Sequence, residues 1–155
     1  MQGTWNIPSA RGAEVRLKSG SLGLMSAEAN APVRHGSLTI DDSGVILDLV
    51  IALEKMKMSN FLLQAAARSM ITMHKVHNLT YRGLGQSLDS VNGIARAGDI
   101  EIPLSLSLTI TGTQLEFIGS ANIGTVHIPL PGMGKIDDFS FDVDAKVVLE
   151  PIVAG

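Results

Sequence analysis

The 155-residue sequence contains no cysteine, which excludes disulfide bonds, thiolate metal sites and a cysteine nucleophile. Aromatic residues make up only 4% of the chain although hydrophobic residues make up 45%, so its interior must be largely aliphatic. The twelve Lys and Arg residues are spread thinly and form no cluster interleaved with aromatics. We therefore expect no nucleic-acid partner.

Long hydrophobic runs are also missing. The longest, from Val45 to Leu53, is interrupted by Asp48 and is far too short to span a bilayer. The first residues have neither a basic start nor an apolar run, so they lack the pattern of a signal peptide. We expect a single cytoplasmic domain over residues 1–155, because this length can bury one self-sufficient core.

Most of the chain alternates apolar and polar residues with a period of two, which is typical of half-buried β-strands. In the clearest segment, 100–110, Leu104, Leu106 and Leu108 share one face, and Ser105 and Ser107 share the other. A turn at 111–114 then predicts a hairpin. The pattern recurs in segments 14–18, 38–40, 115–123 and 139–149, with weaker strand candidates at 22–28, 76–82, 91–97 and 125–129. Phe117, Phe141 and Val143 should point inward, and Asp142 and Asp144 outward.

The segment from Val45 to Leu53 follows a turn at 41–44 and is apolar on both faces, which predicts a strand covered outside as well as inside. Roughly eight strands with one apolar face predict a closed antiparallel barrel, because closure removes the sheet edges. At about eight strands the interior can just hold one small ligand.

One stretch departs from this pattern. EKMKMSNFLLQAAARSMITM, from Glu54 to Met73, holds four of the seven methionines, and apolar residues recur at helical spacing after Ser59. It predicts one short helix over residues 59–70 that plugs or lines one end of the barrel. Methionine adapts to irregular shapes, so the stretch suits either a loose core or a wall that faces a flexible ligand.

The candidate catalytic and metal motifs are weak. His74 and His77 would share a face on a helix but point to opposite faces of the expected strand, and no third ligand lies nearby. The Gly132–Lys135 stretch lacks the Ser or Thr and the first Gly of a phosphate loop. The carboxylate pairs occupy turns or the polar face of a strand. We expect no catalytic residue, no metal and no cofactor.

With the strands placed, nearly the whole chain resembles the YceI-like family. Trp5-x-Ile7 is similar to the family's opening W-x-I/L, and Gly36-x-Leu38-x-Ile40-Asp41 is similar to its G-x-L-x-F-D strand. Asn92–Gly98 resembles the hairpin G-D-L-T-I-x-G, and Phe117–Ile123 resembles the late strand. Two segments depart from the family pattern: 15–20, which replaces V-x-F-x-V-x-H, and 58–70, which replaces R-D-x-H-L-x-S-x-x-F-F.

The resemblance implies an antiparallel lipocalin-like β-barrel of about eight strands with one short helix. It also implies a polyisoprenoid, an isoprenoid quinone or a fatty acyl chain as the ligand in the interior, and a carrier, store or sensor as the function. We expect the ligand to contact Leu17, Met56, Met58, Phe61, Leu62, Met70, Met73, Leu106, Leu108, Phe117 and Phe141.

Two alternatives remain open at this stage: a filled barrel that acts as a protein–protein interaction module, and an enzyme acting on a lipid. A homodimer is also left open.

Overall fold

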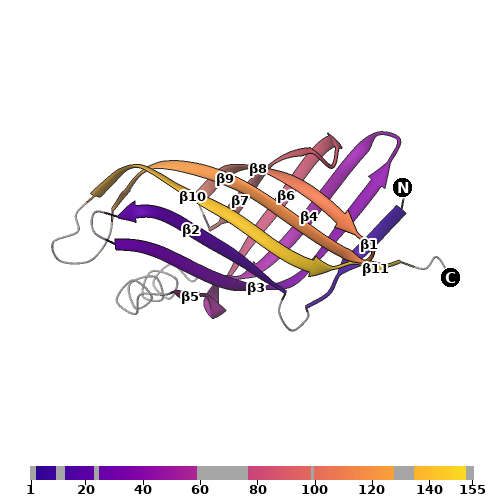
Figure 1. The fold of residues 1–155 in the computed structure, drawn as a ribbon, viewed down its shortest axis with the longest axis horizontal. Coiled ribbons are helices and arrows are strands. Elements are labelled where there is room, and N and C mark those ends of the chain that lie inside the picture. Colours follow the sequence, from indigo (N-terminus) through magenta and orange to yellow (C-terminus); the bar gives the residue numbers. More distant parts are fainter. Residues whose placement is uncertain are drawn as a thin grey trace.

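The computed structural model describes residues 3–9, 13–22, 25–58, 77–98, 100–127 and 135–152. This part of the chain is almost entirely β-structure (Figure 1). In chain order the elements are β1 (Gly3–Ile7), β2 (Glu14–Leu22), β3 (Met25–Asp41), β4 (Gly44–Ala52), the 3-10 helix η1 (Leu53–Lys55), β5 (Lys57–Met58), β6 (Asn78–Ser87), β7 (Ser90–Ala97), β8 (Ile100–Thr111), β9 (Gln114–His127), β10 (Lys135–Val148) and β11 (Glu150–Pro151). Within the described ranges, no helix is long and apolar enough to cross a membrane.

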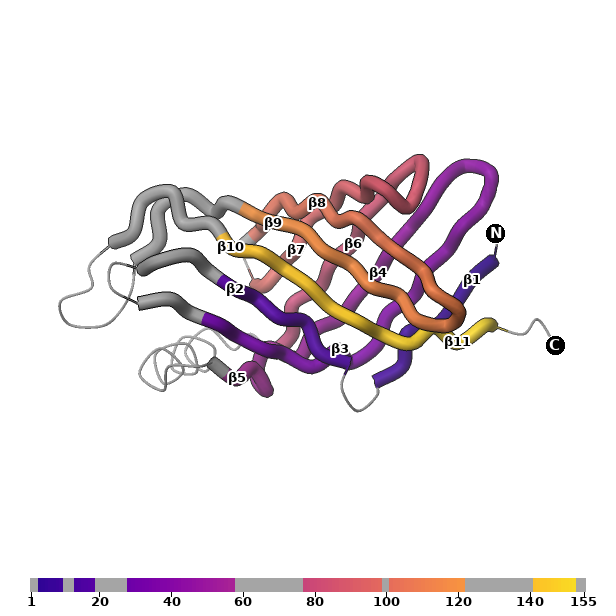
Figure 2. Tube along the Cα trace, in the orientation of Figure 1, coloured from indigo at the N-terminus to yellow at the C-terminus, as the bar shows by residue number. Residues whose placement is uncertain are grey.

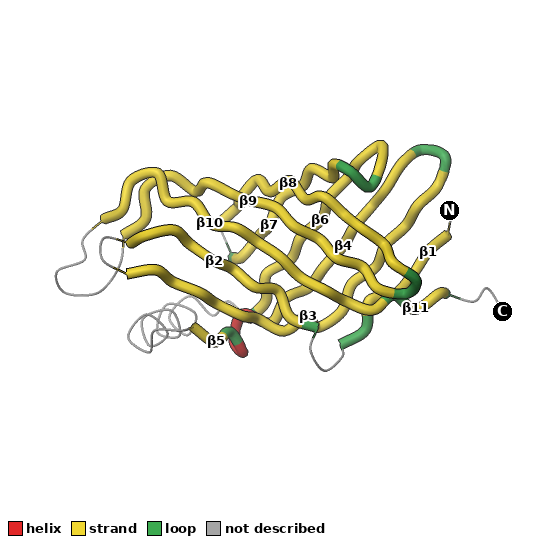
Figure 3. Tube along the Cα trace, in the orientation of Figure 1, coloured by secondary structure: helices red, strands yellow, loops and turns green. Residues whose placement is uncertain are grey.

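Eight of these strands close into an antiparallel barrel (Figure 3). The order around the barrel is β2, β3, β4, β6, β7, β8, β9 and β10, and β10 then pairs with β2 from Phe141↔Ser19 to Ala145↔Val15. Each strand therefore pairs with its neighbours in the chain, as in an up-and-down barrel. The prediction of a mainly β, closed antiparallel barrel of about eight strands is confirmed.

β3 is 17 residues long and carries two partners along each of its edges. On one edge it pairs with β2 through its first half and with β1 through its second half. On the other edge it pairs with β5 at Ala29 and Asn30 and with β4 from Val33 onwards. The short strands β1 and β11 pair with each other at the end where both termini lie (Figure 2).

Tight two-residue turns join β3 to β4, β6 to β7 and β8 to β9, and we call this end of the barrel the hairpin end. In the first turn, the Asp41 carboxylate accepts hydrogen bonds from the backbone N–H and the hydroxyl of Ser43, at 2.8 and 2.5 Å. These bonds stabilise the charged form and lower the pKa of Asp41. In the third turn, Gly112 has a φ of +62°, which glycine adopts without strain. The predicted turns at 41–44 and 111–114 are confirmed.

A β-bulge in β3 reverses its alternation of inward and outward residues. Val33 pairs with Ile51 and His35 pairs with Val50, so Arg34 is an extra residue on the bulged strand. Before the bulge Ala31 and Val33 are buried, and after it Leu38 is buried, so odd positions face the interior first and even positions later. The bulge thus keeps the apolar side chains of β3 on its inner face, although they move from odd to even positions in the sequence.

The strand predictions hold with two exceptions. The expected strand at 22–28 is wrong as a single element, because β2 ends at Leu22 and β3 begins at Met25. The expected strand at 125–129 is instead the end of β9, which reaches His127. On the outer face of β4, Ile46 and Val50 are half-buried, so the expected outer cover is only partial. The predicted helix at 59–70 lies outside the described residues.

Candidate functional site

The barrel encloses a cavity of about 240 Å³. Each of the eight barrel strands contributes to its wall, and η1 contributes one further residue, Leu53. The lining residues are Val15, Leu17, Ala31, Leu49, Ile51, Leu53, Leu79, Tyr81, Ala95, Ile102, Leu104, Leu106, Phe117, Phe141 and Val143. All fifteen side chains are hydrocarbon except for the hydroxyl of Tyr81.

The alternation of β8, β9 and β10 produces this wall directly. Leu106 and Phe117 are 2% and 1% exposed and face the cavity. On the outer face of the same strands, Ser105 and Asp142 are exposed, and Ser107 and Asp144 are partly exposed. Leu104, Leu108, Phe141 and Val143 also pack in the interior. The predicted facing of these residues is therefore confirmed, and the register of this half of the barrel is as expected.

Toward the hairpin end the interior is solid. Nine side chains fill it, each at most 4% exposed, and we call them the packed layer: Ile7, Leu38, Val45, Leu47, Val91, Leu108, Leu115, Val147 and Leu149. The cavity lies on the other side, toward the end of the barrel at which η1 lies, which we call the η1 end. Two small side chains, Ala31 and Ala95, line the cavity where larger residues would fill it.

Tyr81 lies between these two parts of the interior. Its hydroxyl donates a hydrogen bond of 2.9 Å to the backbone carbonyl of Leu104, two strands away around the barrel. The residue is 3% exposed, and this burial raises the pKa of Tyr81 to about 12. The only polar side-chain atom among the lining residues is thus neutral at physiological pH and already hydrogen-bonded.

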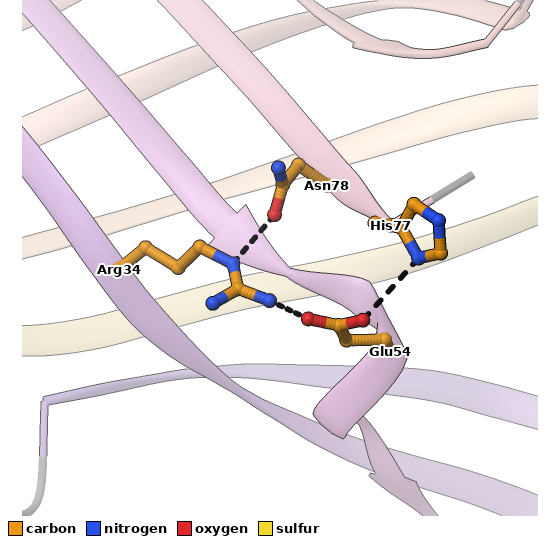
Figure 4. Close-up of polar contacts among 4 residues, drawn as sticks. All are labelled: Arg34, Glu54, His77 and Asn78. Carbon is orange, nitrogen blue, oxygen red and sulfur yellow. Dashed lines mark hydrogen bonds and ion pairs between the residues drawn. The ribbon is translucent and has the colours of Figure 1, made fainter. Parts of the chain in front are cut away.

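A polar cluster lies at the η1 end of the barrel (Figure 4). Arg34 donates one hydrogen bond to the side-chain oxygen of Asn78, at 2.6 Å, and another to the carboxylate of Glu54. The other oxygen of Glu54 lies 3.2 Å from Nδ1 of His77, and the backbone N–H of Glu54 donates to the carbonyl of His77. The cluster joins the bulge of β3 to η1 and to the start of β6, next to the cavity residues Leu53 and Leu79.

Four of the predicted ligand contacts line the cavity: Leu17, Leu106, Phe117 and Phe141. Leu108 is buried in the packed layer, and Met56 is half-buried against the core cluster. Neither is among the residues that line the cavity. Met58 ends β5, and nothing is described of its side chain, while Phe61, Leu62, Met70 and Met73 lie outside the described residues. Contact of these eleven residues with a ligand stays a prediction.

Sequence reasoning missed most of the remaining wall. Leu49 and Ile51 alternate within a strand that we expected to be apolar on both faces, so its inner face was not distinguished. Tyr81 lies at the end of a weak strand candidate, but it is the only tyrosine of the chain, and that rarity was a usable signal. Ala31 and Ala95 could not be identified, because a small residue lines a cavity only if its neighbours leave the space empty.

The other candidate motifs bring no groups together. Among the described residues, no three His, Cys, Asp or Glu side chains are placed to hold a metal ion. The His77 side chain is 67% exposed and lies beside Glu54, while His74 and residues 128–134 are outside the described ranges. Asp144 forms an ion pair with Arg16 on the outer wall, at 2.7 Å.

A hollow of about 560 Å³ also lies on the outer wall, over β8, β9 and β10. Ser105, Ser107, Ser120, Asp142 and Asp144 line it, together with Ile118, which is 52% exposed. This hollow is shallow and open to water, so a ligand there would bury little of its surface. The interior cavity is the stronger candidate, because pockets that hold small molecules enclose most of the ligand.

The fold and the cavity together define a lipocalin-like, up-and-down barrel of eight strands with an apolar interior. Among solved structures, the chain is similar to the crystal structure of Burkholderia cenocepacia BcnA, with a TM-score of 0.58 and 9% sequence identity. The match covers 88% of this chain and 96% of that chain. At this identity the similarity shows a shared fold alone. No protein-family model and no curated protein sequence matches the chain, so membership of the YceI-like family stays a prediction.

Proposed function

We propose that the barrel binds a long apolar or amphiphilic molecule, with the hydrocarbon part inside the cavity, and serves as its carrier, store or sensor. The observation that carries this proposal is the chemistry of the lining. Fifteen residues from the whole circumference of the barrel present hydrocarbon, and the one hydroxyl among them is already bonded to Leu104. Such a wall favours burial of apolar surface and opposes any unpaired polar group.

The size of the cavity sets a scale for the affinity. A volume of about 240 Å³ accommodates roughly eight groups of the size of a water molecule or a methylene, at about 30 Å³ each. At roughly 0.8 kcal/mol per buried methylene, eight groups contribute about 6 kcal/mol. This gross value corresponds to dissociation constants on the order of tens of micromolar, before the costs of ordering the ligand are subtracted.

A polar head group would remain at the η1 end. There the cavity wall at Leu53 and Leu79 adjoins the cluster of Arg34, Glu54 and His77, so charged groups border the apolar interior. An amphiphile could keep its head near these charges while its chain occupies the barrel. The resemblance to the YceI-like family supports a polyisoprenoid, an isoprenoid quinone or a fatty acyl chain as this ligand.

The two alternatives have less support. A filled barrel acting only as a protein–protein module would need no cavity. Among the described residues, the exposed large hydrophobics are spread over the fold, with β7 and β8 between Leu84 on β6 and Ile118 on β9, while Val148 ends β10 and Ile152 follows β11. An enzyme acting on a lipid would need converging polar groups near the ligand, and the lining residues offer only the engaged hydroxyl of Tyr81.

The proposal is tested by mass spectrometry of an organic extract of the purified protein and by binding of a fluorescent acyl probe. Ala31→Leu adds three carbons to the cavity wall and should weaken probe binding about tenfold or more, because it removes space for about two methylenes. Thr109→Leu places the same leucine on the exposed outer face of β8 and serves as the control. Equal probe binding by all three proteins, with no apolar molecule in the extract, would contradict the proposal.

A further inference from the structure

The cavity stops abruptly at one level of the barrel. Along β9 the interior passes from cavity wall at Phe117 to the packed layer at Leu115, and along β8 it does so from Leu106 to Leu108. On β6 the same step falls between Tyr81, which lines the cavity, and Gly83, which has no side chain to add to the packed layer. Whatever covers the position of Gly83 therefore forms the floor of the cavity.

The ring of Tyr81 covers this position. A Cβ atom built on Gly83 would lie 2.6 Å from the Tyr81 hydroxyl oxygen and 2.5 Å from a Cγ of Val91, a member of the packed layer. The phenol therefore extends from its own position toward the hairpin end and lies between the cavity and Val91. Val91 is 0% exposed, so no space remains behind the ring at this point.

The absence of a side chain at Gly83 makes this placement of the ring possible. Gly83 on β6 is paired with Gly93 on β7, and a Cβ atom on Gly93 would approach the Cα of Gly83 to 2.6 Å, so the second glycine lets the two strands lie close together. With no side chain on Gly83, the ring passes close to the barrel wall and its hydroxyl reaches the carbonyl of Leu104 on β8. That hydrogen bond crosses β7 and holds the ring in place, so the floor is fixed rather than adaptable.

We infer that Tyr81 sets the depth of the cavity and thereby selects ligands by the length of their hydrocarbon part. This inference rests on the proposed function and adds to it a limit on chain length. The buried end of the ligand must be plain hydrocarbon, since the floor offers it only an aromatic ring and an engaged hydroxyl. Carbons beyond roughly the eighth lie outside the cavity that the described residues line, and each should add less affinity than the carbons inside it.

The test measures the affinity of saturated n-alkanols of increasing length by displacement of a bound fluorescent acyl probe. In the wild type, the affinity should rise about fourfold per methylene and level off near eight carbons. We call the chain length at which the affinity levels off the break. Tyr81→Ala removes the floor and should move this break about three carbons longer, allowing for partial collapse of the site. Tyr81→Leu should move it by about one carbon and is the milder variant if the alanine protein fails to fold.

Three further variants make the result specific. Tyr81→Phe keeps the ring but loses the hydrogen bond to Leu104, and should lengthen the break by less than Tyr81→Leu does. Ala95→Leu, on the strand paired with Tyr81, narrows the cavity above the floor and should move the break about two carbons shorter. Leu149→Ala destabilises the packed layer beside the third turn, where the backbone N–H of Leu149 donates to the carbonyl of Thr113, and should leave the break unchanged.

The outcomes distinguish the depth-setting role of Tyr81 from the proposed function as a ligand-binding barrel. A break that lengthens with Tyr81→Leu or Tyr81→Ala, and not with Leu149→Ala, supports the inference. A break that stays in place in both Tyr81 variants, while the wild type still binds the alkanols, overturns the depth-setting role and leaves the proposed function standing. If no alkanol competes with the probe and the probe itself does not bind the wild type, the proposed function fails and the inference fails with it.

Discussion

The packed layer and the cavity wall share six barrel strands, β3, β4, β7, β8, β9 and β10, and the same alternation, yet one is solid and the other hollow. In the packed layer, Ile7 from β1 and Leu149, which follows β10, add to the residues of the barrel strands. In the cavity wall the described residues make one such addition, Leu53 from η1, while Ala31 and Ala95 take inward positions. An eight-stranded barrel is just wide enough to be filled by side chains. A few residue sizes, rather than the fold, therefore decide whether it holds a ligand.

The largest test of this contrast compares two leucine truncations. Leu115→Ala removes a fully buried side chain from the packed layer and should lower the free energy of unfolding by about 4 kcal/mol, because the close-packed surroundings cannot collapse into the space. Leu104→Ala changes a half-buried residue beside an existing cavity and should cost about 2 kcal/mol or less. Urea denaturation of both variants measures the difference. Equal losses would mean that the cavity is filled in solution.

The boundary between the two parts can be tested through the titration of Tyr81. At low pH the phenol is neutral in both the folded and the unfolded protein, and folding raises its pKa from 10.0 to about 12. Between pH 10 and 12 the unfolded chain loses this proton first, so stability falls as the pH rises, by up to about 2 kcal/mol. Urea melts at pH 9 and 11.5 should show this loss in the wild type and a smaller one in Tyr81→Phe. The same loss in both proteins would place the Tyr81 hydroxyl in contact with water.

The alanine-to-leucine substitution should have opposite effects at two positions of the interior. Ala31→Leu fills existing empty space and should raise the free energy of unfolding by about 1 kcal/mol, as cavity-filling changes do. Ala145→Leu inserts the same side chain at a position on β10 that is 2% exposed and, unlike its strand partners Val15 and Phe117, does not line the cavity, and should lower the free energy of unfolding by about 1–3 kcal/mol. Thermal melts of the pair provide the measurement. A stabilised Ala145→Leu protein would reveal unfilled space beside Ala145.

The smallest effect is expected outside both parts, in the polar cluster at the η1 end. Glu54→Gln removes the ion pair with Arg34 and the contact with His77, whose side chains are 31% and 67% exposed. The free energy of unfolding should fall by about 0.5 kcal/mol at low salt, and less at high salt, because water and ions screen the pair. Urea melts at two salt concentrations check this. A loss as large as that of Leu115→Ala would show that η1 supports the whole barrel.

Roughly eight alternating segments were sufficient to predict the closed antiparallel barrel, and the strong alternation of β8, β9 and β10 also predicted the inward face of that half. The phase of β3 was not predictable, because the bulge at Arg34 moves the inward face from odd to even positions. With a strict period of two, the sequence of β3 therefore resembles two separate short strands rather than one long strand. The expected strand at 22–28 is wrong for a related reason. β2 ends and β3 begins inside this range, and a hairpin can interrupt the alternation without a strong turn signal.

The sequence indicated that the barrel could hold a cavity, but it did not indicate where in the barrel the cavity lies. Empty space depends on the summed volumes of residues that come from eight strands, and a sequence pattern shows only which face each residue occupies. Four expected contacts do line the cavity, because strong alternation placed them inside. The role of Tyr81 was missed because it depends on the contact of its ring with Gly83 and Val91 and on the hydrogen bond to Leu104, and the register of β6, β7 and β8 decides that these residues meet.

The pairing of β2 with β10 has a consequence for how the chain folds. The ion pair between Arg16 and Asp144 joins residues 128 positions apart, so closure brings together the two ends of the chain. Contacts at such separation are slow to form, and during synthesis β2 must wait for almost the whole chain to emerge. Until then its edge can pair with other chains, and the charged residues Glu14, Arg16 and Lys18 along it disfavour such pairing. The residues that close the finished barrel thus also protect the incomplete one from aggregation.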